Sequence, residues 1–376
     1  MKIAILINTF HKGKGMDYVA EQQAKELCES GNKVTIYTFD CDHQINNIAI
    51  KEIGWPKMMV PNLLYRLLFS FDFLKNEKLA KEISQYDLVI AHFYPITHLA
   101  YLAKRKQNTL KYIYYNHGIG GSLSKNSPTL RKIYLKILGK AQEKTFSNAD
   151  LIVSISYFID KTIKPLGIPS CVVYNHVDIK KFDTEPSSEA IRNLGLPRSG
   201  PKFLYVGVLT QSKGIELLID SFIKVKKTYL DAKLIIIGSP SFGFDYKKLG
   251  IDNSEDIMFL GFIKDSQVVG HIYRSCDVYV SSSMRESFNL PAVEAQMMGK
   301  PVVLFNIGAH NEIVKDGVSG ILVDPFDTVK FANAMIAVYK NKDQMGLEAR
   351  KWAEKFSTES KELMTISKIV SNITKA

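Results

Sequence analysis

The stretch DVYVSSSMRESFNLPAVEAQMMGKPVVLFN, residues 277–306, has the pattern of a buried strand, a helix and a second buried strand. Its two apolar runs, 277–283 and 301–306, have the length and the residue types of strands. Between them, Pro291 suits the first turn of a helix, and Gly299 marks the end of that helix near residue 298. Two strands joined by a crossover helix lie parallel in one sheet. The stretch therefore predicts an α/β fold.

Apolar runs alternate with helical patterns along the whole chain, which indicates doubly wound parallel sheets. The expected strands are 2–7, 33–39, 87–93, 110–116, 151–156 and 171–175 in the first half, and 202–209, 232–239, 256–262, 277–283, 301–306 and 320–325 in the second. A helix is expected over 17–30, with Gly31 as its C-terminal glycine.

A segment rich in Pro, Ser and Gly, residues 183–200, separates the two alternating halves. At 376 residues the chain exceeds the usual size of a single core. We therefore expect one Rossmann-like domain over 1–182, a linker over 183–200 and a second Rossmann-like domain over 201–356, with the carboxyl edges of their sheets facing a central cleft. Helical apolar spacing at 357–376 predicts a C-terminal helix that packs back on the first domain.

The composition is that of an ordinary globular protein, with 46% hydrophobic and 23% charged residues. Its cysteines, Cys28, Cys41, Cys171 and Cys276, show no CxxC spacing, so neither a disulfide framework nor a zinc site is expected. A cytoplasmic location fits this cysteine usage. The N-terminal apolar run is too short for a signal peptide, and no window is apolar enough to span a membrane.

The positive charge is concentrated in the first half of the chain. Residues 1–182 carry 25 Lys+Arg and 15 Asp+Glu, or +10, while residues 183–376 carry 24 and 23, or +1. The stretch 129–144 interleaves basic and apolar residues at helical spacing, and 58–71 is strongly apolar. The basic stretch is either an ordinary surface helix or a segment that lies on the inner face of an anionic membrane. Nucleic acid is not expected, because no nucleic-acid-binding motif accompanies the charge.

Two glutamates flank the expected helix 291–298 and suggest what its N-terminus binds. Free N–H groups and the helix dipole make such an N-terminus a phosphate site. Glu286 precedes the helix and Glu294 lies one turn into it. Because a carboxylate can accept hydrogen bonds from two adjacent hydroxyls, the pair points to a nucleotide sugar. The alternative is that Glu286 is a solvated loop residue and that Glu294 only complements the dipole.

The segment ESFNLPAVEAQMMGKPVV (286–303) resembles the donor-site signature E-x-F-G-x-x-x-x-E-A, followed by G-x-P-V, of the family 4 (group 1) retaining glycosyltransferases, which have the GT-B fold. The resemblance implies that Glu286 contacts the donor sugar and Glu294 the ribose. It also implies that the backbone amides of Phe288, Asn289 and Leu290 face the diphosphate. By the same resemblance the first domain binds the acceptor and the second binds the donor.

Further motifs extend the resemblance. VGVLTQSKGIELLIDSF (206–222) resembles the family segment G-R-L-x-x-x-K-G, which implies that Lys213 binds the diphosphate within a loop framed by Gly207 and Gly214. Val208 replaces the usual arginine, and Arg285 is a candidate substitute. The segments 172–182 and 306–327 also match the family pattern. Asn289 replaces a glycine, and asparagine is among the few residues that tolerate a left-handed backbone.

In the first half, YYNHGIGG (114–121) places His117 between a strand and three glycines, Gly118, Gly120 and Gly121. This resembles the family histidine that approaches the donor sugar and phosphate, so we expect His117 to be functional and His92 and His98 to be structural. Gly13 and Gly15 are expected in a loop that faces the acceptor and the diphosphate. The motif DCD (40–42) is expected to be a polar loop rather than a metal site.

These features predict an enzyme that transfers a hexose from a nucleoside diphosphate sugar, of the UDP or GDP type, to an acceptor hydroxyl with retention. Catalysis would involve His117, Glu286 and Lys213, with no separate cofactor and no metal. The acceptor is expected to be a glycan or a lipid-linked molecule in cell-surface polysaccharide or glycolipid biosynthesis. The alternative is a non-catalytic nucleotide-sugar-binding subunit that scaffolds a glycan-assembly complex, which the missing arginine at Val208 would favour.

Overall fold

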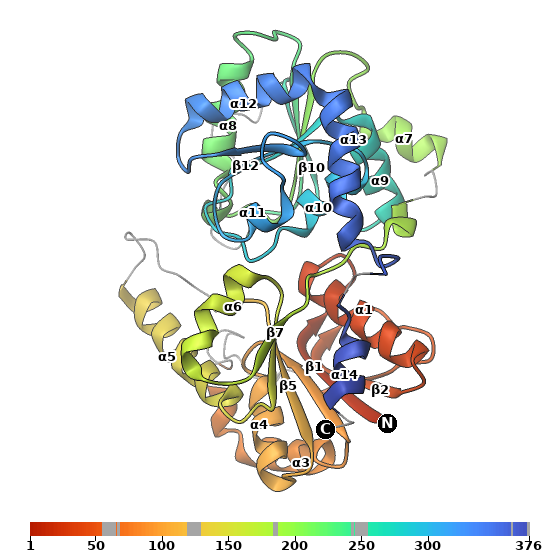
Figure 1. Cartoon of the computed structure of the whole chain (residues 1–376), viewed down its shortest axis with the longest axis vertical. Helices are drawn as coiled ribbons and strands as arrows, with labels where there is room; N and C mark the ends of the chain where they lie inside the picture. Colours follow the sequence, from red (N-terminus) through yellow and green to blue (C-terminus); the bar gives the residue numbers. More distant parts are fainter. Residues whose placement is uncertain are drawn as a thin grey trace. The chain divides into compact units, whose positions relative to one another are not determined.

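A computed structural model describes residues 1–54, 65, 68–118, 129–182, 187–241, 244, 255–361 and 364–373. The chain forms two compact units (Figure 1). The first unit comprises Met1–Tyr174 with Met364–Ala376, and the second comprises Asn175–Leu363. Within the described residues, no helix has the length and apolar character needed to cross a membrane.

The first unit contains a seven-stranded parallel sheet in the order β3-β2-β1-β4-β5-β6-β7. Its strands are β1 (Lys2–Phe10), β2 (Lys33–Cys41), β3 (Ala49–Glu52), β4 (Leu88–His92), β5 (Lys111–Asn116), β6 (Leu151–Ser154) and β7 (Ser170–Val172). All six strands predicted for this half are present. The edge strand β3 was not predicted, because its sequence AIKE is almost wholly exposed and therefore has no apolar run.

Helices cover both faces of this sheet (Figure 1). They are α1 (Gly15–Glu29), α3 (Phe73–Ile83), α4 (Thr97–Lys106), α5 (Thr129–Phe146), α6 (Tyr157–Ile163) and α14 (Ile366–Ile373). The predicted end of the first helix is confirmed, since Gly31 follows α1 with a left-handed φ of 82°. Helices α3 and α4 pack with the sheet around a core that includes Leu79, Leu99 and Tyr112.

The C-terminal segment differs from the single helix predicted over 357–376. Among the described residues of this segment only α14 is helical, and it contacts α1, where the backbone N–H of Ser367 donates to Glu26 Oε1 at 2.8 Å. Ser357 is extended and forms an isolated parallel bridge with Val177 in the second unit. The prediction of one continuous helix was therefore wrong, because backbone pairing with Val177 holds the start of the segment in an extended conformation.

The second unit contains a six-stranded parallel sheet in the order β10-β9-β8-β11-β12-β13. Its strands are β8 (Lys202–Val206), β9 (Lys233–Ile237), β10 (Ile257–Gly261), β11 (Val278–Ser281), β12 (Val302–Phe305) and β13 (Gly320–Val323). All six were predicted. The chain runs outward from β8 to β10 and then returns to β11 on the other side of β8. This places a topological switch point at the carboxyl ends of β8 and β11, where open α/β sheets bind ligands.

The helices of the second unit lie in two layers (Figure 1). On one face α8 (Ile215–Val225) and α12 (Thr328–Lys340) share a core with the sheet. On the other face lie α9 (Ser266–Ser275), α10 (Leu290–Met297) and α13 (Lys342–Ala353), with α10 against both β11 and α13. Two short helices, α7 (Ser188–Leu194) and α11 (His310–Ile313), also belong to the described part of this unit. Helix α10 is the predicted helix 291–298, displaced by one residue.

Candidate functional site

Loops that follow β8 and β11 meet at the switch point of the second unit. The loop 207–214 follows β8, and the loop 282–289 follows β11 and leads into α10. They are bonded to each other, since the Met284 N–H donates to the Ser212 carbonyl at 2.9 Å and Ser282 Oγ donates to the Gly214 carbonyl at 2.7 Å. The two predicted donor motifs are therefore adjacent in space and fixed in register.

Two glycines allow the backbones to approach this closely. Gly214 has φ 65°, and a Cβ there would lie 2.1 Å from the Ser282 carbonyl oxygen. Gly308, in the loop after β12, has φ 56°, and its Cβ would lie 2.0 Å from the Glu286 carbonyl oxygen. Both positions thus combine a left-handed backbone with a contact that only glycine permits. Gly207 lies at the start of the first loop, and its N–H donates to the Ile237 carbonyl at 2.9 Å.

An ion pair joins the two loops. Lys213 Nζ lies 2.5 Å from Glu286 Oε1, with 29% of the lysine side chain and 11% of the glutamate side chain exposed. Lys213 ends the short 3₁₀ helix Gln211–Lys213, and Gly214 follows it. The site therefore places an ammonium group and a carboxylate together at the switch point, just ahead of the N-terminus of α10.

Glu294 lies in the second turn of α10, and both of its oxygens are bonded. Oε1 accepts from Lys181 Nζ at 2.6 Å, and Oε2 accepts from the Tyr273 hydroxyl at 3.0 Å. Burial, and then the nearby Glu294 carboxylate, hold the pKa of Tyr273 well above its usual value. Sequence reasoning missed both partners: Lys181 lies within the segment 172–182 that resembles the family, but its spacing carried no signal of a contact with Glu294.

Asn289 begins α10 with φ 80°, the left-handed backbone that its identity predicted. Its Oδ1 accepts from the Ala292 N–H at 3.3 Å, and its Nδ2 lies 2.9 Å from His310 Nε2. His310 Nδ1 lies 2.6 Å from the Phe305 carbonyl, which can only accept. His310 therefore carries its proton on Nδ1 and accepts from Asn289 at Nε2. Burial lowers the pKa of His310, so the imidazole is neutral.

The other predicted residues around the N-terminus of α10 differ in what they expose. The Phe288 ring is 2% exposed and packs edge-on against Phe356 at a centroid distance of 5.6 Å, so its side chain anchors the loop. Leu290 is the first residue of α10. Arg285 is exposed in the same loop, and its carbonyl accepts from Ser283 Oγ at 3.0 Å. Val208 is 53% exposed.

His117 lies in the first unit and is not among the contacts around α10 described for the second unit. It follows β5, and its Nε2 lies 2.8 Å from Nδ1 of His92, the last residue of β4. Burial lowers the pKa of His117 to about 4. It also lowers the pKa of His92, with His117 as a second cause. The Gly118 N–H donates to Asn116 Oδ1 at 3.0 Å, whereas Gly120 and Gly121 lie outside the described residues.

The loop after β1 is held by polar contacts. Gly13 has φ 89°, and Gly15 is the first residue of α1 rather than part of the loop. His11 Nε2 lies 3.0 Å from Asp40 Oδ2, and the Lys12 N–H donates to Asp42 Oδ1 at 2.9 Å. The predicted polar loop at DCD was thus partly wrong, because β2 continues through Cys41. Among the residues that the structure describes, no cluster of His, Cys, Asp or Glu could hold a metal ion.

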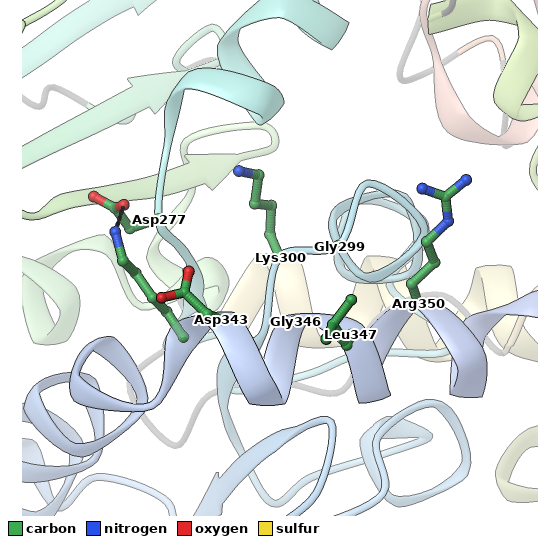
Figure 2. A pocket seen from close by; sticks show the side chains of 8 residues that line it. Asp277, Gly299, Lys300, Asp343, Gly346, Leu347 and Arg350 are labelled. Carbon is green, nitrogen blue, oxygen red and sulfur yellow. Dashed lines mark hydrogen bonds and ion pairs between the residues drawn. The ribbon is translucent and has the colours of Figure 1, made fainter.

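A cavity of about 370 Å³ lies elsewhere on the second unit (Figure 2). It is lined by Asp277, Gly299, Lys300, Lys342, Asp343, Gly346, Leu347 and Arg350. Asp277 directly precedes β11 and Gly299 follows α10, so the cavity lies at the amino ends of the strands, away from the switch point. Lys342 Nζ bonds Asp277 at 2.5 Å, and Lys300 Nζ donates to the Arg274 carbonyl at 2.8 Å. None of the predicted donor-binding residues lines it, so the cavity is not the predicted donor site.

Solved structures share this architecture along the whole chain. Sucrose-phosphate synthase from Thermosynechococcus elongatus superposes with a TM-score of 0.78 at 18% identity, covering 100% of this chain and 98% of the other. HepE of Anabaena, solved with UDP and glucose, gives a TM-score of 0.76 at 20% identity and covers 100% and 98%. The predicted fold, two Rossmann-like domains of the GT-B type, is confirmed.

Sequence comparison identifies the family. An uncharacterized glycosyltransferase of Methanocaldococcus jannaschii is 28% identical over 323 residues, which are 80% of this chain and 79% of the relative. Residues 13–181 match the family described as Glycosyltransferase Family 4, and residues 187–358 match the family described as Glycosyl transferases group 1. With both regions matched, the chain belongs to the group 1, family 4 glycosyltransferases, a retaining family.

Proposed function

We propose that the switch point of the second unit binds the nucleoside diphosphate sugar from which this glycosyltransferase takes a hexose. The observation that carries the proposal is the Lys213–Glu286 ion pair, which lies between the two bonded loops ahead of the N-terminus of α10. A cation and the free amides of a helix N-terminus attract a diphosphate, and a carboxylate accepts from sugar hydroxyls. In this arrangement the 1–182 region takes the acceptor and the 201–356 region takes the donor.

Donor binding would exchange the partners of the ion pair. Without a donor, Glu286 neutralises Lys213. With a donor, the ammonium of Lys213 contacts the diphosphate, together with the amides of Phe288, Asn289 and Leu290, while Glu286 accepts from hydroxyls of the sugar. Each carboxylate oxygen of Glu294 has one bond within the protein and a lone pair left for the ribose hydroxyls. Arg285 supplies a further positive charge near the phosphates in place of the arginine that Val208 replaces.

Catalysis then rests on position and charge. Lys213 and the α10 N-terminus stabilise the diphosphate as it leaves, which lowers the energy of the transition state more than that of the bound donor. Glu286 orients the sugar and does not attack it. His117, in the first unit, also takes part in the transfer, as its motif implies. Gly207, at the start of the loop after β8, and Gly15, the first residue of α1, are further candidate ligand contacts. The donor is of the UDP or GDP type; HepE, which shares the fold, was solved with UDP.

Isothermal titration calorimetry with UDP, GDP and ADP, and then with their hexose conjugates, tests the site. Lys213→Gln should weaken binding of the matching nucleotide by about tenfold or more, since a charge-assisted hydrogen bond contributes about 1.5–3 kcal/mol. Lys224→Gln is the matched control, because it removes a lysine that is also paired to a carboxylate, Asp220, at 2.5 Å on the exposed surface of α8. Equal binding by the Lys213 and Lys224 variants would contradict the proposal.

Glu286→Gln separates binding from turnover. It should keep or raise the affinity for the nucleoside diphosphate itself, because it releases Lys213 from the ion pair and removes only a contact to the sugar, and it should lose most of the transfer rate. Glu294→Gln should instead weaken the binding of the nucleotide and the binding of its hexose conjugate to the same extent. Unchanged hexose transfer by Glu286→Gln would refute its role. Donor binding with no transfer by the wild-type chain to any acceptor tested would favour the scaffold function.

We further propose that the acceptor is a glycan or a lipid-linked molecule at an anionic membrane, where the chain binds peripherally on the cytoplasmic face. The +10 charge of residues 1–182 supports this, and so does an apolar cluster before and within the first turn of α3. There Leu68, Phe71, Phe73 and Leu74 are 45%, 66%, 70% and 89% exposed. Most of the stretch 58–71 lies outside the described residues. Exposed apolar groups beside basic residues suit insertion at a lipid interface.

Vesicle sedimentation tests this location. The chain should bind vesicles of phosphatidylglycerol and phosphatidylcholine, bind less as salt rises, and bind pure phosphatidylcholine weakly. Leu74→Ser should reduce binding, whereas Leu230→Ser, an 82% exposed leucine of the second unit, should not. Absent or salt-independent binding, or equal effects of the two substitutions, would contradict a membrane-bound acceptor.

A further inference from the structure

Two buried histidines meet at the carboxyl edge of the sheet in the first unit. β4 and β5 are neighbours, with His92 in register with Tyr115, so His117 follows just beyond the paired residues. His92 is 1% exposed and His117 is 7% exposed. Their rings lie 5.1 Å apart, and the Nδ1 of His92 is 2.8 Å from the Nε2 of His117. This is a direct imidazole–imidazole hydrogen bond.

One proton lies in that hydrogen bond, and the nitrogen that carries it determines the tautomer of both rings. A proton on each facing nitrogen would set two N–H donors against each other with no acceptor between them. Burial disfavours an imidazolium at either histidine, so each neutral ring carries one proton. If His117 Nε2–H donates, His92 carries its own proton on Nε2. If His92 Nδ1–H donates, the His92 Nε2 is a bare lone pair, and His117 carries its own proton on Nδ1.

The surroundings of His92 distinguish these two arrangements. Its Nε2 is buried and has no hydrogen-bond partner in the part of the chain that the structure describes. An unpaired buried N–H is tolerated less well than an unpaired acceptor, so the arrangement in which His92 Nδ1–H donates is favoured. His117 then accepts at Nε2, and its protonated Nδ1 is the nitrogen left for a ligand.

The backbone around His92 is held in place. Phe93, which follows it, has φ 31°, a conformation that few side chains adopt and that persists only when the surroundings enforce it. Asn8 at the carboxyl edge of the sheet supplies such a constraint: its Nδ2 donates to the Tyr94 carbonyl at 3.0 Å, and its Oδ1 accepts from the Ile96 N–H at 3.2 Å. The backbone that follows His92 is thus fixed by the fold.

We propose that His92 is a positioning residue that fixes His117 as the Nδ1–H tautomer, so that His117 meets its ligand as a neutral hydrogen-bond donor. Its partner would be an oxygen of the substrate, either a phosphate oxygen or a sugar hydroxyl. A hydrogen-bond donor at that position stabilises negative charge on the substrate oxygen, and the protonated Nδ1 cannot act as a base. The assignment of the ligand rests on the proposed function, whereas the tautomer does not. The expectation that His92 is purely structural is replaced by this role.

Nitrogen-15 NMR of ring-labelled histidine in the full chain reads the tautomer directly. The sequence has 8 histidines, and His117→Gln identifies the His117 signals. We expect a protonated Nδ1 and an unprotonated Nε2 for His117 at pH 7. His92→Asn keeps an N–H donor near the position of Nδ1 and should preserve this pattern. His92→Leu has a similar size but no donor, and should give a mixture of tautomers. A proton on His117 Nε2 in the wild type would overturn the proposal.

The kinetics of hexose transfer provide a second test of the role of His92. Once a donor sugar is found, His92→Leu should lower kcat by about tenfold with KM changed less than about twofold, and His92→Asn should restore most of kcat. Melting temperatures show whether either variant is misfolded, and if His92→Leu does not fold, the wild-type tautomer and His92→Asn still decide. Equal kcat in wild type and a folded His92→Leu would overturn the role. If no transfer is found at all, the proposed function fails while the NMR result stands.

Discussion

Substitution of Asn289 separates the backbone contribution of this residue from that of its side chain. Asn289 has φ 80° and caps α10 through Oδ1, and its Nδ2 donates to His310. Asn289→Ala removes the helix cap and the hydrogen bond to His310. It also leaves an ordinary side chain, with no polar group, in the left-handed backbone conformation. Asn289→Gly removes the same side chain but suits that backbone. The two variants therefore differ chiefly in the cost of the left-handed conformation.

The costs follow from these contacts. A left-handed backbone costs an ordinary residue about 1–2 kcal/mol, and loss of the cap costs about 1 kcal/mol when alanine replaces asparagine. Leaving His310 Nε2 buried and unpaired adds about 1–3 kcal/mol. Asn289→Ala should therefore lower the free energy of unfolding of the second unit by about 3–6 kcal/mol. Asn289→Gly should be milder by about 2–3 kcal/mol, because it avoids the first cost and, at a cap position, most of the second.

Urea unfolding followed by tryptophan fluorescence measures this difference. Trp352 lies in α13 of the same unit and its Nε1 donates to the Ile313 carbonyl at 3.0 Å, so its emission should report on the packing of that unit. The sequence has 2 tryptophans, and Trp55→Phe as the common background leaves Trp352 as the reporter. If Asn289→Gly were as destabilised as Asn289→Ala, the left-handed backbone would not be what selects asparagine here, and the reasoning would fail.

Two further predictions concern the loops and the buried histidines. Gly308→Ala should destabilise the second unit and weaken nucleotide binding, because its Cβ would lie 2.0 Å from the Glu286 carbonyl oxygen. Gly317→Ala is the control: it has φ 73° but nothing within 4 Å, so thermal unfolding should show only the backbone cost of about 1–2 kcal/mol. The folded pKa of His117, about 4, lies below the unfolded value of about 6.5, so acidification favours the unfolded state. The free energy of unfolding should fall by about 2 kcal/mol more between pH 7 and pH 5 in wild type than in His117→Gln, and equal slopes would contradict the buried neutral state.

Most of the fold could be predicted because buried parallel strands have a strong local signal. Each predicted strand is a short apolar run between helical patterns, and β4 and β11 are examples in which every residue is buried. The signal failed where burial was absent, as in β3, or where pairing with a distant strand decided the backbone, as at Ser357. Local spacing reports burial and helicity, but it does not report which distant backbone a segment will pair with.

The candidate site was predicted in part. Glu286, Glu294, Lys213 and Asn289 were identified from motifs, and the structure brings Glu286 against Lys213. Their other partners come from distant segments: Lys181 is 113 residues from Glu294, and His310 is 21 residues from Asn289. A lone lysine or histidine in the sequence carries no mark of such a contact, so these partners could not be chosen over other residues of the same type.

The sequence by itself determined the succession of strands and helices along the chain. It also determined the left-handed start of α10 at Asn289 and the presence of a carboxylate on each side of Pro291. These depend on residue type and on neighbours within a few positions, and local conformational preference is enough to specify them. Only the tertiary structure decided that Lys213 neutralises Glu286 and that His92 bonds His117. Those pairings depend on which strands lie side by side in the sheet. That arrangement is set by the burial of the whole sheet rather than by any single segment.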